Sequence, residues 1–301
     1  MNKRLLAIIA AIGATTIYGI NHTVAKGIMP HYVQPYGFII LRVLGAAILF
    51  WLISPLGPKE KIDPKDYLRM IVCAFLGMGL NMLVFFKGLS LSTPINSAVL
   101  ITTTPIIVLV LSAVILKEKI SSRKILGIGI GLFGALGLIL YGSEVRQDAP
   151  NIPMGNFLIF LNSIFYGSYL VVVKALITKY HPFTFMKWLF SLGVLICLPF
   201  GLEEFMQIEW SSLPFEAYRG IAFVILGTTF CTYLFNIFAL TQLKASTLSA
   251  FVYVQPLVGI GYAIFTGQDN LTLIKIVAAC FVLVGVYLAS RKPNRFYQKL
   301  K

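Results

Sequence analysis

Apolar runs of about twenty residues recur along the whole chain, each separated from the next by a short polar or basic connection. A hydrocarbon layer about 30 Å thick is crossed by a helix of about 20 residues, so each run has the length of a membrane span. The pattern predicts an all-α integral membrane protein. We expect ten transmembrane helices, at residues 5–26, 35–55, 67–89, 94–116, 122–141, 154–178, 183–202, 215–240, 246–266 and 271–290.

Most of the lysines and arginines lie at alternate ends of these runs. They precede the first run, follow the second, fourth, sixth and eighth runs, and fill the tail 291–301. Glu203 and Glu204 lie in a connection on the other side of the membrane. Because cytoplasmic loops carry an excess of Lys and Arg, both termini are predicted to face the cytoplasm. We expect a multi-pass protein of the inner (cytoplasmic) membrane. The first run is interpreted as a span and not as a cleaved signal peptide, because nine similar runs follow it.

Composition narrows the possible partners and cofactors. Of the 301 residues 58% are hydrophobic and 12% charged, and the formal charge of +14 comes from basic residues beside the runs. We therefore expect a lipid bilayer and a small-molecule substrate as partners, no nucleic acid, and a monomer or weak dimer. The four cysteines lie in apolar runs without CxxC spacing, so no metal site and no cofactor are expected.

The second half of the chain repeats the first. Two short motifs and two Pro-to-acid spacings recur after about 150 residues, which predicts two five-helix units, 1–145 and 146–290. Because five is odd, the second unit enters the bilayer from the opposite side, and such inverted repeats are typical of transporters. The matching pairs are Pro105 and Pro256, Glu118 and Asp269, Leu76-Gly77 and Leu226-Gly227, Tyr18-Gly19 and Tyr166-Gly167, and Lys26 and Lys174.

The sequence resembles the drug/metabolite transporter superfamily, in particular its ten-helix EamA-type members. The resemblance is based on the helix count, the inverted halves, the prolines of the fourth and ninth spans and the acid in LKEKIS. The resemblance covers residues 5 to 290. The second repeat departs from the usual pattern, with GQDNLT where a Gly-Glu pair is common. The resemblance implies a secondary transporter, commonly an exporter of small metabolites or amino acids, with a central cavity between spans 1, 3, 4, 6, 8 and 9.

No acidic residue lies in the middle of a predicted span, since all eleven fall in connections or at helix ends. A pump for cationic drugs generally needs a membrane-buried acid as counter-charge and proton carrier. The sequence therefore favours a neutral, zwitterionic or anionic substrate and weak dependence of transport on a proton gradient.

Polar side chains recur where the two repeats place the cavity. Asn162, Tyr166 and Tyr169 share one helix face, and polar residues stand before both Pro105 and Pro256, where a proline frees backbone carbonyls. A bend in the helix alone explains the Thr-Pro segment of the fourth span equally well. The candidate substrate-binding residues are Tyr18, Asn21, His22, Arg42, Asn81, Thr102, Asn162, Tyr166, Asn236, Tyr253 and Gln255.

Several candidates have a structural alternative. Asn81 and Asn236 contact substrate or join helices. His22 is a proton carrier or a hydrogen-bonded interhelical residue. Lys26 and Arg42 are expected to extend to the membrane interface. As an alternative, Arg42 faces the cavity and favours a substrate with a carboxylate or phosphate group.

The segment GIGLFG at 129–134 matches a dinucleotide-binding pattern but lies inside an apolar run without a preceding strand. Gly127 and Gly131 instead have GxxxG spacing, which predicts close helix packing, with Gly285 as a candidate partner.

Three functions remain after these exclusions. The first is a secondary transporter that exports a small polar metabolite, an amino acid or related compound, by alternating access. A membrane-embedded enzyme acting on lipid is a second, although none of the three histidines has an acid at a recognisable spacing. A channel is the third.

Overall fold

The structure is a computed structural model that describes residues 3–116, 122–141, 148–242, 251 and 254–290. All regular elements in these ranges are helices, and each predicted span coincides with helical structure, the ninth from Val254 onward. The all-α membrane fold is thereby confirmed. The spans described as single helices are α1 (Lys3–Ile28), α2 (Pro35–Ile53), α7 (Ser122–Tyr141), α8 (Ile152–Ile177), α9 (Pro182–Met206) and α14 (Leu273–Ser290), and α13 (Val254–Phe265) is the described helix of the ninth span.

Three spans change their helical type on the way through the bundle. Before Pro105, the 3₁₀ turn η4 interrupts the fourth span, and the Thr102 and Thr103 hydroxyls donate to the carbonyls of Val99 and Leu100 at 2.6 and 2.7 Å. The threonines thus satisfy backbone carbonyls near the proline. The segments are η2 (Pro64–Asp66), α3 (Tyr67–Ala74), η3 (Phe75–Leu80) and α4 (Asn81–Leu91); α5 (Pro94–Leu100), η4 (Ile101–Thr103) and α6 (Thr104–Leu116); and α10 (Phe215–Ala222), η6 (Phe223–Cys231) and α11 (Thr232–Gln242).

Both η3 and η6 are π-helices, and they fall at matching places in the two halves, since each contains one copy of the repeated Leu-Gly pair. A π-helix is rare and is found disproportionately at functional sites. Its recurrence indicates that the two halves share this local structure as well as sequence.

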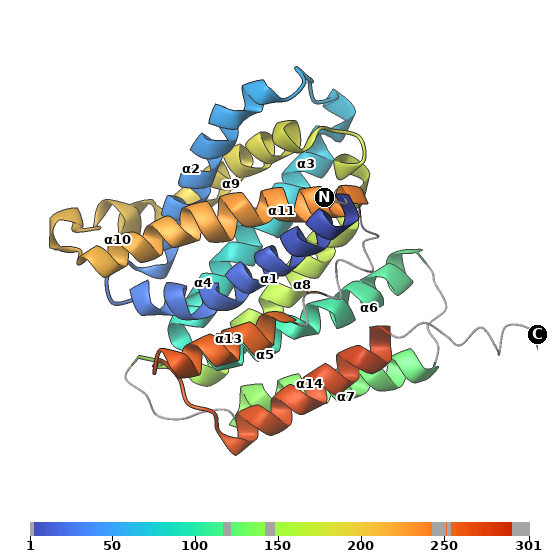
Figure 1. The fold of residues 1–301 in the computed structure, drawn as a ribbon, viewed down its shortest axis with the longest axis vertical. Coiled ribbons are helices and arrows are strands. Elements are labelled where there is room, and N and C mark those ends of the chain that lie inside the picture. The colour runs from blue at the N-terminus through green and yellow to red at the C-terminus, as the bar shows by residue number, and fades with distance from the viewer. Residues whose placement is uncertain (1–2, 117–121, 142–147, 243–250, 252–253, 291–301) are drawn as a thin grey trace, which may run out of the picture.

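Helix packing is reciprocal between the halves (Figure 1). The first span packs against the eighth and ninth, through α11 and α13, and the sixth span, α8, packs against the third and fourth, through α4 and α6. The second and seventh spans, α2 and α9, pair with each other, as do the fifth and tenth, α7 and α14. This exchange of partners is the arrangement that a two-fold relation between the halves produces.

Two carboxylates repeat the same relation at the helix ends. Glu204 accepts the backbone N–H groups of Tyr36 and Gly37 at 2.6 and 2.9 Å, and Glu60 accepts that of His181 at 2.7 Å. The first N–H groups of a helix have no partner within the helix. Each half therefore caps the proline-opened helix, α2 or α9, of the other half.

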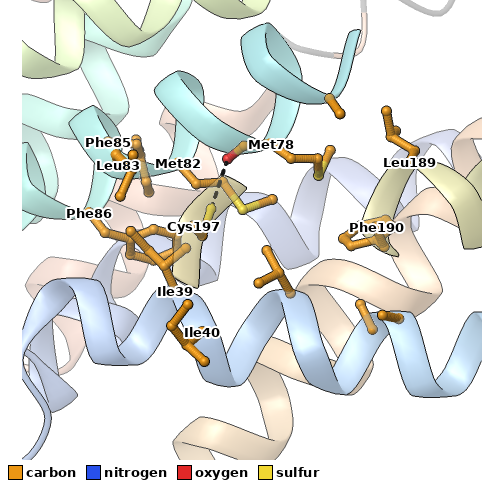
Figure 2. Packing of buried hydrophobic residues seen from close by; sticks show 14 of the residues in the cluster. Ile39, Ile40, Met78, Met82, Leu83, Phe85, Phe86, Leu189, Phe190 and Cys197 are labelled. Carbon is orange, nitrogen blue, oxygen red and sulfur yellow. Dashed lines mark hydrogen bonds between the residues drawn. The ribbon is translucent and has the colours of Figure 1, made fainter. Parts of the chain in front are cut away.

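The apolar core lies between α2, α9 and the third span. Figure 2 shows Phe86 beside Ile39 of α2, and Met78 joined through its backbone carbonyl to Cys197 of α9, with Phe190 of α9 farther along that helix. All five side chains are fully buried or nearly so. The tyrosines Tyr166, Tyr169 and Tyr233, described below, lie in this core or pack against it.

At one end of the bundle, Lys26 is buried and does not extend to the interface. Its ammonium donates to the carbonyls of Leu89 and Ser90 at 3.1 and 2.8 Å, and to that of Asp148. The last carbonyls of α4 lack partners within their own helix, so they offer the lysine a nearer set of acceptors than solvent. The interfacial position expected for Lys26 is wrong for this reason.

At the opposite end, Lys179 pairs with Asp63 at 3.2 Å and with Asp66. The hydrogen bond to the Asp66 carboxylate raises the pKa of Lys179 above its usual range. These partly exposed ion pairs join the connection before α3 to the connection before α9.

Candidate functional site

Arg42 lies inside the bundle, eight residues into α2, and is 7% exposed. Its Nε donates to Thr229 Oγ1 of η6 at 2.7 Å, and its guanidinium carbon lies 5.2 Å from the centre of the Phe86 ring. Thr229 lies 14 residues after Phe215 and 7 before Asn236, well inside its span. The guanidinium therefore points into the protein and does not extend along α2 to the interface.

Two tyrosines, Tyr18 of α1 and Tyr233 of α11, lie near this guanidinium, and Tyr166 and Tyr169 of α8 lie near these two tyrosines. Tyr18 of α1 has Thr232, Asn236 and Arg42 as polar neighbours. We call the following residues the Arg42 cluster: Tyr18, Arg42, Tyr166, Tyr169, Thr229, Thr232, Tyr233 and Asn236.

The rings of this cluster are held by aromatic and glycine contacts. Tyr166 and Tyr169 of α8 stack with their centres 5.9 Å apart, which confirms that they share a face. Tyr169 packs over Gly77 of η3, where an added Cβ would stand 2.6 Å from the ring. Tyr233 meets Phe190 edge-on at 5.1 Å. The π-helical segment thus brings a glycine against the tyrosine that closes one side of the cluster.

His22 forms a second polar group one turn along α1. Its Nδ1 lies 2.9 Å from Ser97 Oγ of α5, and its Nε2 lies 3.1 Å from Gln255 Nε2 of α13. The ring meets Phe85 edge-on at 5.7 Å. Since the amide nitrogen of Gln255 is a donor only, Nε2 is the acceptor and Nδ1 carries the proton to Ser97. Both ring nitrogens form hydrogen bonds that join three spans. His22 is therefore a hydrogen-bonded interhelical residue, which is one of the two roles considered for it.

Buried polar atoms without a hydrogen-bond partner gather on spans 1, 4, 6 and 8. In the described part of the chain they are Asn21 Oδ1, Thr23 Oγ1, Asn96 Oδ1 and Nδ2, Thr104 Oγ1, Asn162 Oδ1, Ser163 Oγ and Thr228 Oγ1. Leaving a buried polar group unbonded costs about 1–3 kcal/mol. Unused buried donors and acceptors of this kind indicate positions where a polar ligand or water completes the bonding.

The structure brings several predicted site residues together and separates others. Tyr18, Arg42, Tyr166 and Asn236 meet in the Arg42 cluster, and His22 meets Gln255. Tyr253 lies outside the described residues.

The remaining candidates lie on the same helices with other partners. Asn162 Nδ2 donates to the backbone carbonyl of Asn81 at 2.9 Å, and Asn81 itself is half-buried. Thr102 is 1% exposed, and its hydroxyl donates a hydrogen bond to the backbone carbonyl of Val99. Asn21 is 4% exposed, and its amide oxygen has no hydrogen-bond partner.

Sequence reasoning missed three contributors, Thr229, Tyr233 and Ser97. Each contacts a predicted residue from a span distant in sequence. The repeated Leu-Gly pair was the available signal for the first two, because it marks the π-helical segment that carries or precedes them.

The surface hollows of the molecule do not coincide with this site. One lies between α2 and α9 beside Leu44 and Trp51, and another lies along α9 beside Leu198 and Met206. Both are lined mainly by apolar residues on the outer side of the bundle, so they suit acyl chains better than a polar solute. Within the described residues there is no group of three metal-ligating side chains.

The helical bundle with a polar interior defines a membrane transport protein, and comparison with known proteins agrees. The EamA-like transporter family matches residues 5–140 and again 153–291, so the chain belongs to that family.

Two relatives extend over nearly the whole chain. The uncharacterized transporter YyaM of Bacillus subtilis (strain 168) is 25% identical over 96% of this chain and 94% of its own length. An uncharacterized transporter of Archaeoglobus fulgidus is 27% identical over 92% and 96%. A solved crystal structure with 15% identity superposes with a TM-score of 0.61 over 96% of each chain and shows the same fold.

Proposed function

We propose that the protein is a secondary transporter that moves a small polar metabolite across the cytoplasmic membrane by alternating access, in the direction of export. Family membership supports transport in general. The observation that carries the finer proposal is the set of buried, unbonded polar atoms on spans 1, 4, 6 and 8, together with the Arg42 cluster beside them. A site of modest polar contacts at mid-membrane binds a solute without holding it permanently.

In this proposal residues 1–145 and 146–290 are the two inverted units, both termini are cytoplasmic, and the protein acts as a monomer or weak dimer. The Lys26 end then faces outward and the Lys179 end faces the cytoplasm. Alternating access requires the two ends to open in turn, and the reciprocal packing of α1 and α8 supports such an exchange.

Counterflow in proteoliposomes tests the proposal. Purified protein is reconstituted, loaded with a candidate solute, and supplied with radiolabelled solute outside, using amino acids, organic acids, phosphate esters and nucleosides in turn. Saturable uptake stimulated by internal solute is expected for at least one class. Non-saturating flux without trans-stimulation indicates a channel, and chemical turnover of bilayer lipid indicates an enzyme; either result contradicts a carrier.

Removal of the Tyr166 hydroxyl by Tyr166→Phe is expected to lower apparent solute affinity about 2- to 10-fold, the range of one neutral hydrogen bond. The stacked ring is kept, so protein stability is expected to stay unchanged. The measurement is the solute concentration for half-maximal counterflow.

Tyr67→Phe is the matched control, because Tyr67 is 53% exposed on α3. Equal affinities for both variants and the wild type would remove Tyr166 from the binding site.

A further inference from the structure

Arg42 carries a positive charge that no carboxylate in the described residues balances. Its one hydrogen bond is from Nε to the uncharged Thr229, and its other close contact is the Phe86 ring. An arginine has five N–H donors, so most of its hydrogen-bonding capacity is unused in this structure. A charge inside a membrane span costs several kcal/mol and marks a functional site by default.

The fold itself does not require this arginine. Prolines 35 and 182 open the paired helices α2 and α9, and the residue seven positions after each is Arg42 in one and Leu189 in the other. Leu189 is fully buried in the apolar core. Thr229 does not depend on the arginine either, because its hydroxyl donates to the carbonyl of Val224 at 2.9 Å. The charge is therefore a departure from the symmetry of the halves.

The described acids are engaged elsewhere or lie at the ends of the bundle. Glu60 and Glu204 cap α9 and α2, and Asp269 pairs with Lys275 at 2.8 Å. Asp63 and Asp66 pair with Lys179. A bound ammonium group would find no counter-charge beside Arg42, whereas a bound anion would find one.

We propose that Arg42 is the anion-binding subsite of the transport site and that the substrate is an organic anion, a carboxylate or a phosphate monoester. The inference rests on the proposed transport function and names its substrate class. The planar guanidinium bonds either group through paired N–H donors. The Phe86 ring contacts the guanidinium, and Tyr18 and Tyr233 lie near it, so aromatic rings are available to the remainder of the molecule.

A charge-matched binding experiment tests the subsite. The melting temperature of the detergent-solubilised protein is titrated with propionate, 3-phenylpropionate and methyl phosphate, with propionamide and 3-phenylpropanamide as neutral counterparts, and with phenylalanine as a zwitterion. Sodium chloride holds ionic strength constant. A carboxylate is expected to bind about 10- to 100-fold more tightly than its amide, the range of a charge-assisted hydrogen bond. The phosphate arm distinguishes the two anionic groups.

Two variants separate a binding role from a structural one. In Arg42→Gln and Arg42→Leu the preference for anion over amide is expected to disappear, and the ligand-free protein is expected to melt at the same temperature or higher, because an unbalanced buried charge is gone. Arg69→Gln, which removes an exposed arginine of α3, keeps the preference. Equal binding of anions and amides by the wild type, retained preference in Arg42→Leu, or a lower melting temperature of both ligand-free variants would overturn the inference.

A counterflow experiment distinguishes failure of the anion-binding subsite from failure of the proposed transport function. Trans-stimulated exchange of the amides without exchange of the anions would leave a transporter whose substrate class is different. Anion-selective binding that depends on Arg42 without counterflow of any solute would support the subsite and contradict transport.

Discussion

Replacement of Asp269 by Asn is expected to destabilise the protein by about 3–5 kcal/mol, the cost of breaking a buried ion pair from one side. Asp269 and Lys275 have side chains that are 0% and 1% exposed, with 2.8 Å between Oδ1 and Nζ. Asparagine keeps the size of the side chain and an oxygen for the backbone N–H of Ile95, which Asp269 accepts at 3.0 Å. What remains is the ammonium of Lys275 without its counter-charge. The measurement is the SDS concentration that half-unfolds the protein in mixed micelles.

The double variant Asp269→Asn/Lys275→Met is the control for this prediction. It removes both charges, so it is expected to recover most of the lost stability, since an apolar pair of similar volume replaces a buried ion pair at little cost. If the single and double variants lose equal stability, the effect arises from the contact with α5 through Ile95 and not from the stranded lysine.

The sequence predicts the fold well because each span is a local property. A run of apolar residues long enough to cross the hydrocarbon layer needs no knowledge of its neighbours, and the prolines at 35, 94 and 182 open helices where the runs begin. The changes of helical type are different. Nothing in the hydrophobic pattern distinguishes a π-helix from an α-helix, so η3 and η6 emerge only from the structure.

The candidate site is predicted in part for the same reason. The repeat places Tyr18 and Tyr166 on equivalent faces, and the structure puts Tyr18 near both Arg42 and Tyr166. The partners of these residues come from spans far away in sequence: Thr229 lies 187 residues from Arg42, and Ser97 lies 75 residues from His22. Such contacts depend on which helices pack together. The buried pair of Asp269 and Lys275 was missed likewise, because the lysine looks like one more flanking basic residue.

The two halves share some structural features and differ in others. The features that recur in both halves, such as the carboxylate caps and the π-helices, hold the bundle together or shape its interior. Arg42 opposite Leu189 is a feature that does not recur, and it is the residue that we propose as the anion-binding subsite. Specificity in a repeated fold is therefore best sought where the two halves differ.

Replacement of Gly285 by Ala is expected to destabilise the protein by weakening the contact between α7 and α14. The predicted partnership of Gly127 and Gly131 with Gly285 is confirmed, because a Cβ added at Gly285 would stand 2.3 Å from Gly131 N and 2.6 Å from the Gly127 carbonyl oxygen. Both are backbone atoms, so no side-chain rotation relieves the overlap and the two helices must separate. We expect a loss of about 1–3 kcal/mol, the usual cost of overpacking, measured as a lower midpoint of SDS unfolding.

Gly129→Ala is the matched control on the same helix pair. A Cβ at Gly129 meets nothing within 4 Å, and alanine is favoured over glycine inside a helix by about 0.5–1 kcal/mol. Gly129→Ala is therefore expected to leave stability unchanged or to raise it. Equal unfolding midpoints for the two variants would show that the fifth and tenth spans are not in close backbone contact in the bilayer. Because small residues replace the missing hydrophobic drive for helix association in lipid, the pairing of α7 with α14 would then need another source.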